Sequence, residues 1–197
     1  CSTDGNEVAV MCSTPSNNPP VLMTDTANTD TGNGIYANFP QTNMTGLDNL
    51  RYLFQIQLTS NGTIFIGGQD AYLKMVLYQW NAVEQGSLIV IFQGFDFEFY
   101  VEDNIAFIGG YFYAGSNPSY KYNTTARYNL EAREWLSMDE VSLTLTANFS
   151  QSGQIMRIVP WDFTGLVYVG GRFTQVGTTK VANWAGYNTE GRVSDTV

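Results

Sequence analysis

The sequence predicts an all-β fold built from about three copies of one antiparallel sheet unit. Three observations lead to this prediction. The composition favours strands and turns, a diglycine ends a short apolar run three times, and a second motif follows the diglycine in the same order. The diglycines recur at intervals of 42 and 61 residues, and periods of about this size are typical of repeat proteins whose sheets pack on one another.

The composition is that of a globular protein with few long helices. Of 197 residues, 44% are hydrophobic and 14% aromatic, which is enough to build a core, and only 14% are charged. Glycine is frequent at 19 residues, and Ser, Thr and Asn are abundant. A long-helix protein would be richer in Ala, Glu, Lys and Leu, so this bias favours strands joined by tight turns.

The diglycine closes a short apolar strand in each copy. Asn61-Gly62 stands before the first of these strands, and Asn-Gly between two apolar runs is a strong signal for a β-hairpin. Spacings of 42 and 61 residues separate successive copies, so the second interval carries an extra segment. The three copies are Gly67-Gly68, Gly109-Gly110 and Gly170-Gly171.

The second motif has the pattern Ala-x-Tyr-Asn-x-Glu-x-Arg. It occurs at Ala126–Arg133 and Ala185–Arg192, so that its tyrosine follows the first glycine by 19 residues in one copy and by 17 in the other. In the first copy Trp80-Asn81 stands 13 residues after Gly67. Because two motifs recur in one order, we interpret the chain as repeated units.

These motifs divide the chain into five segments. Residues 1–50 are a loop-rich lead-in or the remnant of a preceding repeat, with strand candidates at Glu7–Met11 and Ile35–Phe39. An insertion at 139–154 contains the alternating run Val141–Thr146, which favours a strand. The predicted sheet units are 51–94, 95–138 and an incomplete third at 155–197.

The repeats resemble the kelch-type repeats of β-propellers, including those of fungal cortical-marker surface proteins. The resemblance covers about residues 52–197, and the second copy fits best, with Gly109-Gly110, Tyr128 and then Trp135. Copies one and three lack a Trp at the last position. The resemblance implies a partial β-propeller of about three four-stranded antiparallel blades. Since propellers typically have at least four blades, we expect a segment of a larger propeller, or a partner that supplies the missing edges.

Charge and residue types exclude several functions. The net charge is −9, from 9 basic and 18 acidic residues, which argues against nucleic acid and anionic membrane surfaces as partners. The chain has no histidine, which removes Ser-His-Asp and Cys-His nucleophilic sites and most zinc and copper sites. The longest apolar runs are too short for a transmembrane helix, so we expect no membrane insertion. We predict no enzyme, no cofactor and no metal.

Several residues are candidates for modification or binding. Asn43, Asn61, Asn123 and Asn148 begin N-glycosylation sequons, although about three sequons are expected by chance in such a composition. We predict a disulfide between Cys1 and Cys12, with pairing to a partner chain or two free thiols as the alternatives. The aromatic loop residues either stack on a sugar or protein partner or pack on the sheet. These are Tyr111, Tyr113, Tyr120 and Tyr122.

We interpret two groups of acidic residues as ordinary solvated side chains rather than as metal or catalytic sites. Asp25–Gly34 has some oxygen ligands of a calcium loop, but their order is broken and no closing Glu follows at the right distance. Glu98, Glu102 and Asp103 gather at one hairpin, and Asp139-Glu140 form another pair. Paired carboxylates can hydrolyse glycosides when they face one pocket, whereas neighbours on a turn are usually solvated.

The sequence therefore predicts a module of an extracellular or cell-surface glycoprotein with an adhesion, recognition or structural role. Its partner would be a protein or a carbohydrate, and self-assembly is an open alternative. A first rival is the protomer of an extracellular filament or sheet, because open sheet edges and an uncharged, Tyr-rich surface suit lateral assembly. A second rival is a carbohydrate-active enzyme domain that uses carboxylates alone.

Overall fold

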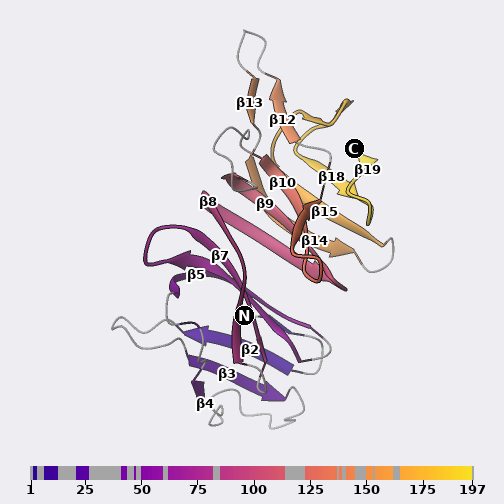
Figure 1. Cartoon of the computed structure of the whole chain (residues 1–197). Coiled ribbons are helices and arrows are strands. Elements are labelled where there is room, and N and C mark those ends of the chain that lie inside the picture. The colour runs from indigo at the N-terminus through magenta and orange to yellow at the C-terminus, as the bar shows by residue number, and fades with distance from the viewer. Residues whose placement is uncertain are drawn as a thin grey trace, which may run out of the picture. The chain divides into compact units, whose positions relative to one another are not determined.

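The computed structural model of the chain describes residues 2–3, 7–12, 21–26, 41–43, 47, 50–59, 62–81, 85–113, 123–136, 138, 141–144, 150–152, 154–161 and 165–196. Among these residues every helix-or-strand element is a strand and the sheets are antiparallel, so the all-β prediction is confirmed (Figure 1). Backbone contacts divide the chain into two compact units, Cys1–Ile91 and Phe92–Val197.

The first unit opens with a four-stranded sheet in the order β1-β2-β3-β4, where the composition indicated mainly loops. The strand candidate at Glu7 is present as β2, and the candidate at Ile35–Phe39 lies outside the described residues. Strand β3 was not predicted, because it contains Thr24, Asp25 and Thr26, which are residue types common in turns. The four strands are β1 Ser2–Thr3, β2 Glu7–Cys12, β3 Val21–Thr26 and β4 Gln41–Asn43.

Strands β5 to β11 follow one another in a hydrogen-bonded ladder that crosses the division between the units inside β8. We name its two parts separately. Sheet I is the part in the first unit, and sheet II is the part in the second. Sheet I contains β5 Leu50–Leu58, β6 Ile64–Asp70, β7 Met75–Asn81 and the first residues of β8 Gln85–Glu102. Sheet II contains the rest of β8 with β9 Ile105–Tyr113, β10 Asn123–Asn129 and β11 Glu134–Leu136.

Sheet III lies in the second unit and is again four strands, in the order β14-β15-β18-β19. Its strands are β14 Gln154–Trp161, β15 Leu166–Arg172, β18 Trp184–Tyr187 and β19 Val193–Thr196. The predicted strand in the insertion is observed as β12, and it joins a small sheet ordered β13-β12-β16-β17. The strands of this small sheet are β12 Val141–Thr144, β13 Ser150–Ser152, β16 Gln175–Val176 and β17 Thr179–Lys180.

Sheets I, II and III share one register at their third strand. In each, the aromatic residue of the third strand pairs with the residue three places before the first glycine of the diglycine. The spacings of 13, 19 and 17 residues therefore differ only in the connection between the second and third strands. The pairs are Trp80 with Ile64, Tyr128 with Ala106, and Tyr187 with Val167.

The first strand of each sheet carries a β-bulge near the diglycine. The register shifts between Leu53 and Gln55 in β5, between Gly94 and Asp96 in β8, and between Ile155 and Arg157 in β14. In sheets I and III the shift falls directly between the partners of the two glycines, and in sheet II it falls two pairs further along. Because a bulge bends its strand and increases the local twist, the three sheets bend at similar places.

Alternation of side chains gives each sheet two faces. We call the face with the third-strand aromatic residue the tyrosine face, and the face with the first glycine of the diglycine the glycine face. Leu53, Trp135 and Pro160 on the tyrosine faces are only partly buried, but most of the described side chains there are buried in all three sheets. The buried ones include Ile56, Ile66 and Tyr78 in sheet I, Phe99, Ile108 and Tyr128 in sheet II, and Val167, Val169 and Tyr187 in sheet III.

Candidate functional site

The glycine face of sheet II packs against the tyrosine face of sheet III, both within the second unit. Phe107 on β9 belongs to the same buried cluster as Ile155 and Ile158 on β14. A Cβ at Gly109 would lie 2.5 Å from Cγ2 of Ile155 and 3.1 Å from Cδ1 of Ile158. The first glycine of the second diglycine is therefore required by the close approach of the next sheet.

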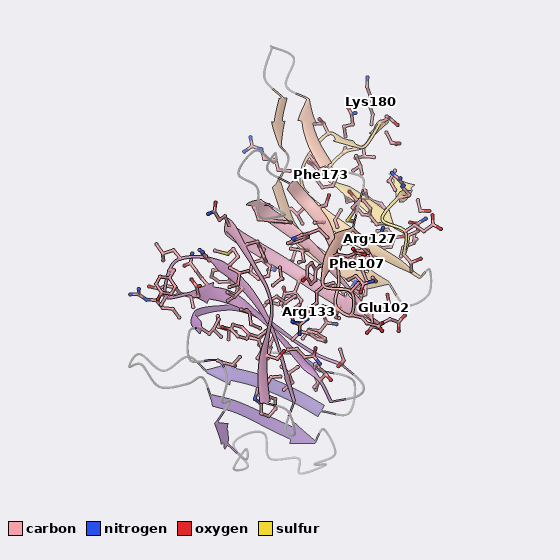
Figure 2. All side chains as sticks on the ribbon, in the orientation of Figure 1. Glu102, Phe107, Arg127, Arg133, Phe173 and Lys180 are labelled. Carbon is pink, nitrogen blue, oxygen red and sulfur yellow. The ribbon has the colours of Figure 1, made fainter. Side chains whose placement is uncertain are left out.

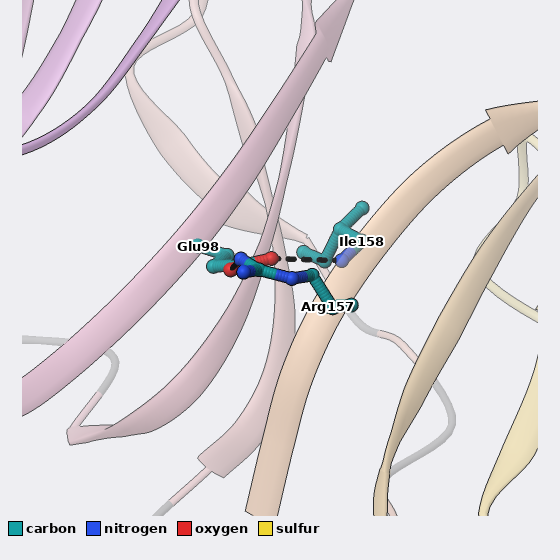
Figure 3. A network of polar contacts seen from close by, with 3 residues as sticks. All are labelled: Glu98, Arg157 and Ile158. Carbon is teal, nitrogen blue, oxygen red and sulfur yellow. Dashed lines mark hydrogen bonds and ion pairs between the residues drawn. The ribbon is translucent and has the colours of Figure 1, made fainter.

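Glu98 joins the two sheets at this contact (Figure 3). Its Oε2 accepts a hydrogen bond of 3.0 Å from the backbone N–H of Ile158, and its Oε1 forms an ion pair with Arg157. The Arg157 side chain is 77% exposed, whereas that of Glu98 is 20% exposed. The carboxylate thus satisfies a backbone donor of β14 and carries a mostly solvated counter-ion.

Arg127, which is labelled in Figure 2, makes a second polar contact between the sheets. Its Nη1 donates a hydrogen bond to the carbonyl oxygen of Thr189, in the turn between β18 and β19. Gly191 in that turn has a φ of 75°, and a Cβ there would lie 2.5 Å from Nε of Arg127. Burial and the positive charge of Arg192 lower the pKa of the Arg127 guanidinium, and Glu190 partly offsets this.

The repeated Tyr-Asn motif forms the turn after the third strand. Asn129 Oδ1 accepts hydrogen bonds from the backbone N–H groups of Glu131 and Ala132, at 3.0 and 2.9 Å. The corresponding oxygen of Asn188 accepts from the N–H groups of Glu190 and Arg192, both at 3.0 Å. The motif therefore encodes an Asx-type turn, in which the side chain replaces a backbone acceptor.

An aromatic cluster fills the tyrosine face of sheet II. The ring centroids of Tyr128 and Trp135 are 5.1 Å apart in an edge-on arrangement, and Phe92 contacts Trp135 at 5.9 Å. Phe97 and Phe112 lie 4.9 and 5.2 Å from Phe92. Burial raises the pKa of the Tyr128 phenol, and the nearby charge of Arg133 lowers it in part. Tyr128 thus acts as a core residue of this sheet.

The glycine face of sheet III contrasts with that of sheet II. Val159 on β14 is 50% exposed, and Tyr168 and Trp184 are partly exposed with their ring centroids 5.2 Å apart. A Cβ built at Gly170 would meet only the carbonyl oxygen of Asn183, at 4.0 Å. Among the described residues this face is thus only partly covered, and Tyr168 and Trp184 present part of their ring surface there.

The predicted glycosylation sites fall in different places. Asn123 is the first residue of β10, where it pairs with Phe112. Asn43 is the last residue of β4 and pairs with Val21. Asn61 and Asn148 lie outside the described residues. Occupancy of these sequons stays a prediction.

The other predicted site residues are only partly described. Tyr111 and Tyr113 belong to β9 rather than to the following loop, since that strand continues three residues beyond Gly110. Tyr120, Tyr122 and Cys1 lie outside the described residues, and Cys12 is the last residue of β2. The binding role of these tyrosines and the disulfide between Cys1 and Cys12 therefore stay predictions.

The acidic candidates are not brought together into one pocket by the described structure. Glu98 is used in the sheet contact, whereas Glu102 and Asp103 lie exposed at the β8–β9 turn, where Asp103 has a φ of 51°. Asp25 pairs with Val8 inside β3. The rest of the Asp25–Gly34 stretch, residues 27–34, and the pair Asp139-Glu140 lie outside the described residues.

Sequence reasoning missed Arg127, Arg157 and the Tyr168–Trp184 pair. Arg127 occupies a variable place in the repeated motif, so the repeat itself gave no reason to select it. Within the described ranges no three His, Cys, Asp or Glu side chains lie close enough to hold a metal ion. The same ranges contain no helix with the length and hydropathy to cross a membrane.

Comparison of the sequence with models of known protein families found no match, and comparison with curated proteins found no significant match.

Proposed function

We propose that the chain is a non-catalytic, propeller-type segment of an extracellular or cell-surface glycoprotein, with an adhesion, recognition or structural role. The observation that supports this most is the contact between sheets II and III. There the second diglycine and the repeated Tyr-Asn turn supply Gly109 and Thr189 to one interface. Blades of a propeller pack face to face in this way, so the repeated motifs serve stacking rather than chemistry.

The positions of the carboxylates favour a role without catalysis. Both oxygens of Glu98 have partners in the sheet contact. A glycosidase needs a second carboxylate facing the first across a substrate, at about 5–9.5 Å. Glu102 and Asp103 stand instead on an exposed turn, where ordinary solvated carboxylates are expected. Glu98 is therefore better explained as a structural group.

The low fraction of charged residues and the partly exposed aromatic residues favour neutral partners. Only 14% of the residues are charged, and Tyr168 and Trp184 present part of their ring surface on a partly exposed sheet face. Such rings contribute contact area to a sugar face or to an apolar protein surface. A carbohydrate or protein partner at the cell surface is consistent with both features.

The proposal is tested by measuring binding and turnover on one preparation. The purified chain is applied to a glycan array and incubated with the oligosaccharides of the same array, and released reducing ends are measured. We expect no turnover, whether or not a glycan binds. Glu98→Gln, Glu102→Gln and Asp103→Asn are assayed together, with Glu134→Gln on the exposed edge of β11 as the control. Turnover that one of the first three variants abolishes, but the control preserves, would refute the non-catalytic role.

A further inference from the structure

Strand β14 breaks the usual alternation of side chains at its bulge. Ile155 and Ile158 are both buried, and both come close to the position that a Cβ would take at Gly109 on sheet II. In a regular strand, residues three places apart point to opposite faces. One extra residue between them returns both to the same face, and the register shift between Ile155 and Arg157 supplies it. The bulge is therefore what lets both isoleucines face sheet II.

Met156 is the extra residue of this bulge. Its neighbours Ile155 and Arg157 pair with the consecutive glycines Gly171 and Gly170 of β15, so the register skips Met156. Met156 is 60% exposed, and the side chain of Arg157 beside it is 77% exposed. The thioether of Met156 therefore stands outside the buried part of the contact between sheets II and III, where solvent reaches it.

The other methionines with described side chains are better protected than Met156. Met75 on β7 is 0% exposed in the core of sheet I. Met138 is partly buried and packs against the cluster that contains Ile155. An oxidant in solution therefore reaches the sulfur of Met156 in the folded chain, whereas it reaches Met75 only when sheet I opens.

We propose that Met156 is a reversible redox modification site, which peroxides such as hydrogen peroxide convert to methionine sulfoxide while the chain stays folded. In this step the O–O bond of the peroxide breaks, one oxygen atom is transferred to the sulfur, and water leaves. The sulfur is oxidised by two electrons, and the peroxide is reduced. Methionine sulfoxide reductases reverse the change with a pair of thiols, which become a disulfide as water is released.

Oxidation at this position should change the surface without loosening the fold. A sulfoxide turns a flexible apolar side chain into a polar one, which disrupts a core but is readily solvated outside it. The extra residues of the other two bulges are Phe54 in sheet I, which is 40% exposed, and Phe95 in sheet II. All three bulges therefore carry a large apolar residue, and of the three only Met156 becomes polar on reaction with a peroxide.

The rates of oxidation of the individual methionines test this proposal. The purified full chain is treated with dilute hydrogen peroxide, the reaction is stopped with catalase at successive times, and the chain is digested. Fragment spectra assign the added oxygen to each methionine, which is necessary because no Lys or Arg lies between Met138 and Met156. We expect Met156 to react at least about tenfold faster than Met75, with Met138 between them. Circular dichroism should stay unchanged until Met75 reacts.

Met156→Leu is the matched control, because leucine keeps an apolar side chain of similar size without the sulfur. It should remove the fast phase of oxidation and leave urea unfolding unchanged. A mixture of the two methionine sulfoxide reductases, one for each sulfoxide epimer, should return the oxidised parent chain to its original mass.

Three results would each overturn the inference. They are oxidation of Met75 or Met138 as fast as that of Met156, loss of the sheet signal while only Met156 is oxidised, and failure of the reductases to restore the chain. The proposed function is judged separately, by turnover on oligosaccharides, and none of these results bears on it.

Discussion

The backbone N–H of Ile158 donates a 3.0 Å hydrogen bond to the carboxylate of Glu98, although 60 residues separate the two in sequence. This bond connects sheet II to the first strand of sheet III. The same carboxylate pairs with Arg157, but that side chain is mostly exposed. The hydrogen bond to the backbone should therefore contribute more to stability than the ion pair.

Removing the Glu98 side chain should be costly, and removing its ion-pair partner should not. We expect Glu98→Ala to lower the free energy of unfolding by about 1–3 kcal/mol, because the Ile158 N–H loses its acceptor at a partly buried contact. Arg157→Ala should cost less than about 1 kcal/mol. Urea denaturation measures both. Equal losses in the two variants would show that the ion pair dominates.

The diglycines should differ in their tolerance of a methyl group. Gly109→Ala would place Cβ 2.5 Å from Ile155 Cγ2, so we expect a loss of about 1–3 kcal/mol in the free energy of unfolding. Gly170→Ala meets nothing closer than 4.0 Å and should change stability by less than about 0.5 kcal/mol. Thermal and urea unfolding give the comparison.

A double variant identifies the cause of that difference. Ile155→Ala removes the Cγ2 atom, so part of the Gly109→Ala penalty should disappear when the two changes are combined. Strict additivity of the two single losses would show that the penalty arises elsewhere.

The two Tyr-Asn turns should respond alike, because each asparagine oxygen accepts two backbone hydrogen bonds. We expect Asn129→Ala and Asn188→Ala each to lower the free energy of unfolding by about 1–2 kcal/mol. Asp in place of either asparagine keeps the acceptor and should preserve most of the stability. Chemical denaturation of the four variants makes the test, and a loss confined to one turn would argue against a shared role of the motif.

Tyr128 should make stability depend on pH at alkaline pH. Its folded-state pKa is raised, mainly by burial, so folding favours the neutral phenol. Its contribution is complete below the ordinary tyrosine pKa of about 10 and is lost as pH rises through the higher folded-state value. The free energy of unfolding should fall above about pH 10 more steeply in the parent chain than in Tyr128→Phe. Parallel curves for the two chains would show that other groups cause the fall.

The sequence predicted the repeated part of the fold through backbone-encoded signals. The diglycine and the Tyr-Asn motif marked the second and third strands, and the register pairs Tyr128 with Ala106 and Tyr187 with Val167 in equivalent positions. These signals are local, since an apolar run, a glycine and a turn residue each act on neighbouring backbone. The closure of the sheets into a propeller is not local, and it stays a prediction.

The contacts between sheets escaped sequence analysis because they depend on distant residues. Arg127 and Thr189 are 62 residues apart, and nothing near either one indicates the partner. Glu98 was noticed only for its acidic neighbours along the hairpin, whereas its partner lies on β14. Strand β3 was missed because of its local composition, since its Thr and Asp residues are common in turns.

Strand β8 has a practical consequence for dissecting this protein. It runs without interruption from Gln85 to Glu102 and contributes to two named sheets. A fragment that ends at the predicted boundary after residue 94, or at the division after Ile91, would divide this strand. Both pieces would then carry unpaired backbone N–H and C=O groups along a strand edge. Expression fragments should instead keep β8 together with both of its hydrogen-bonded neighbours, β7 and β9.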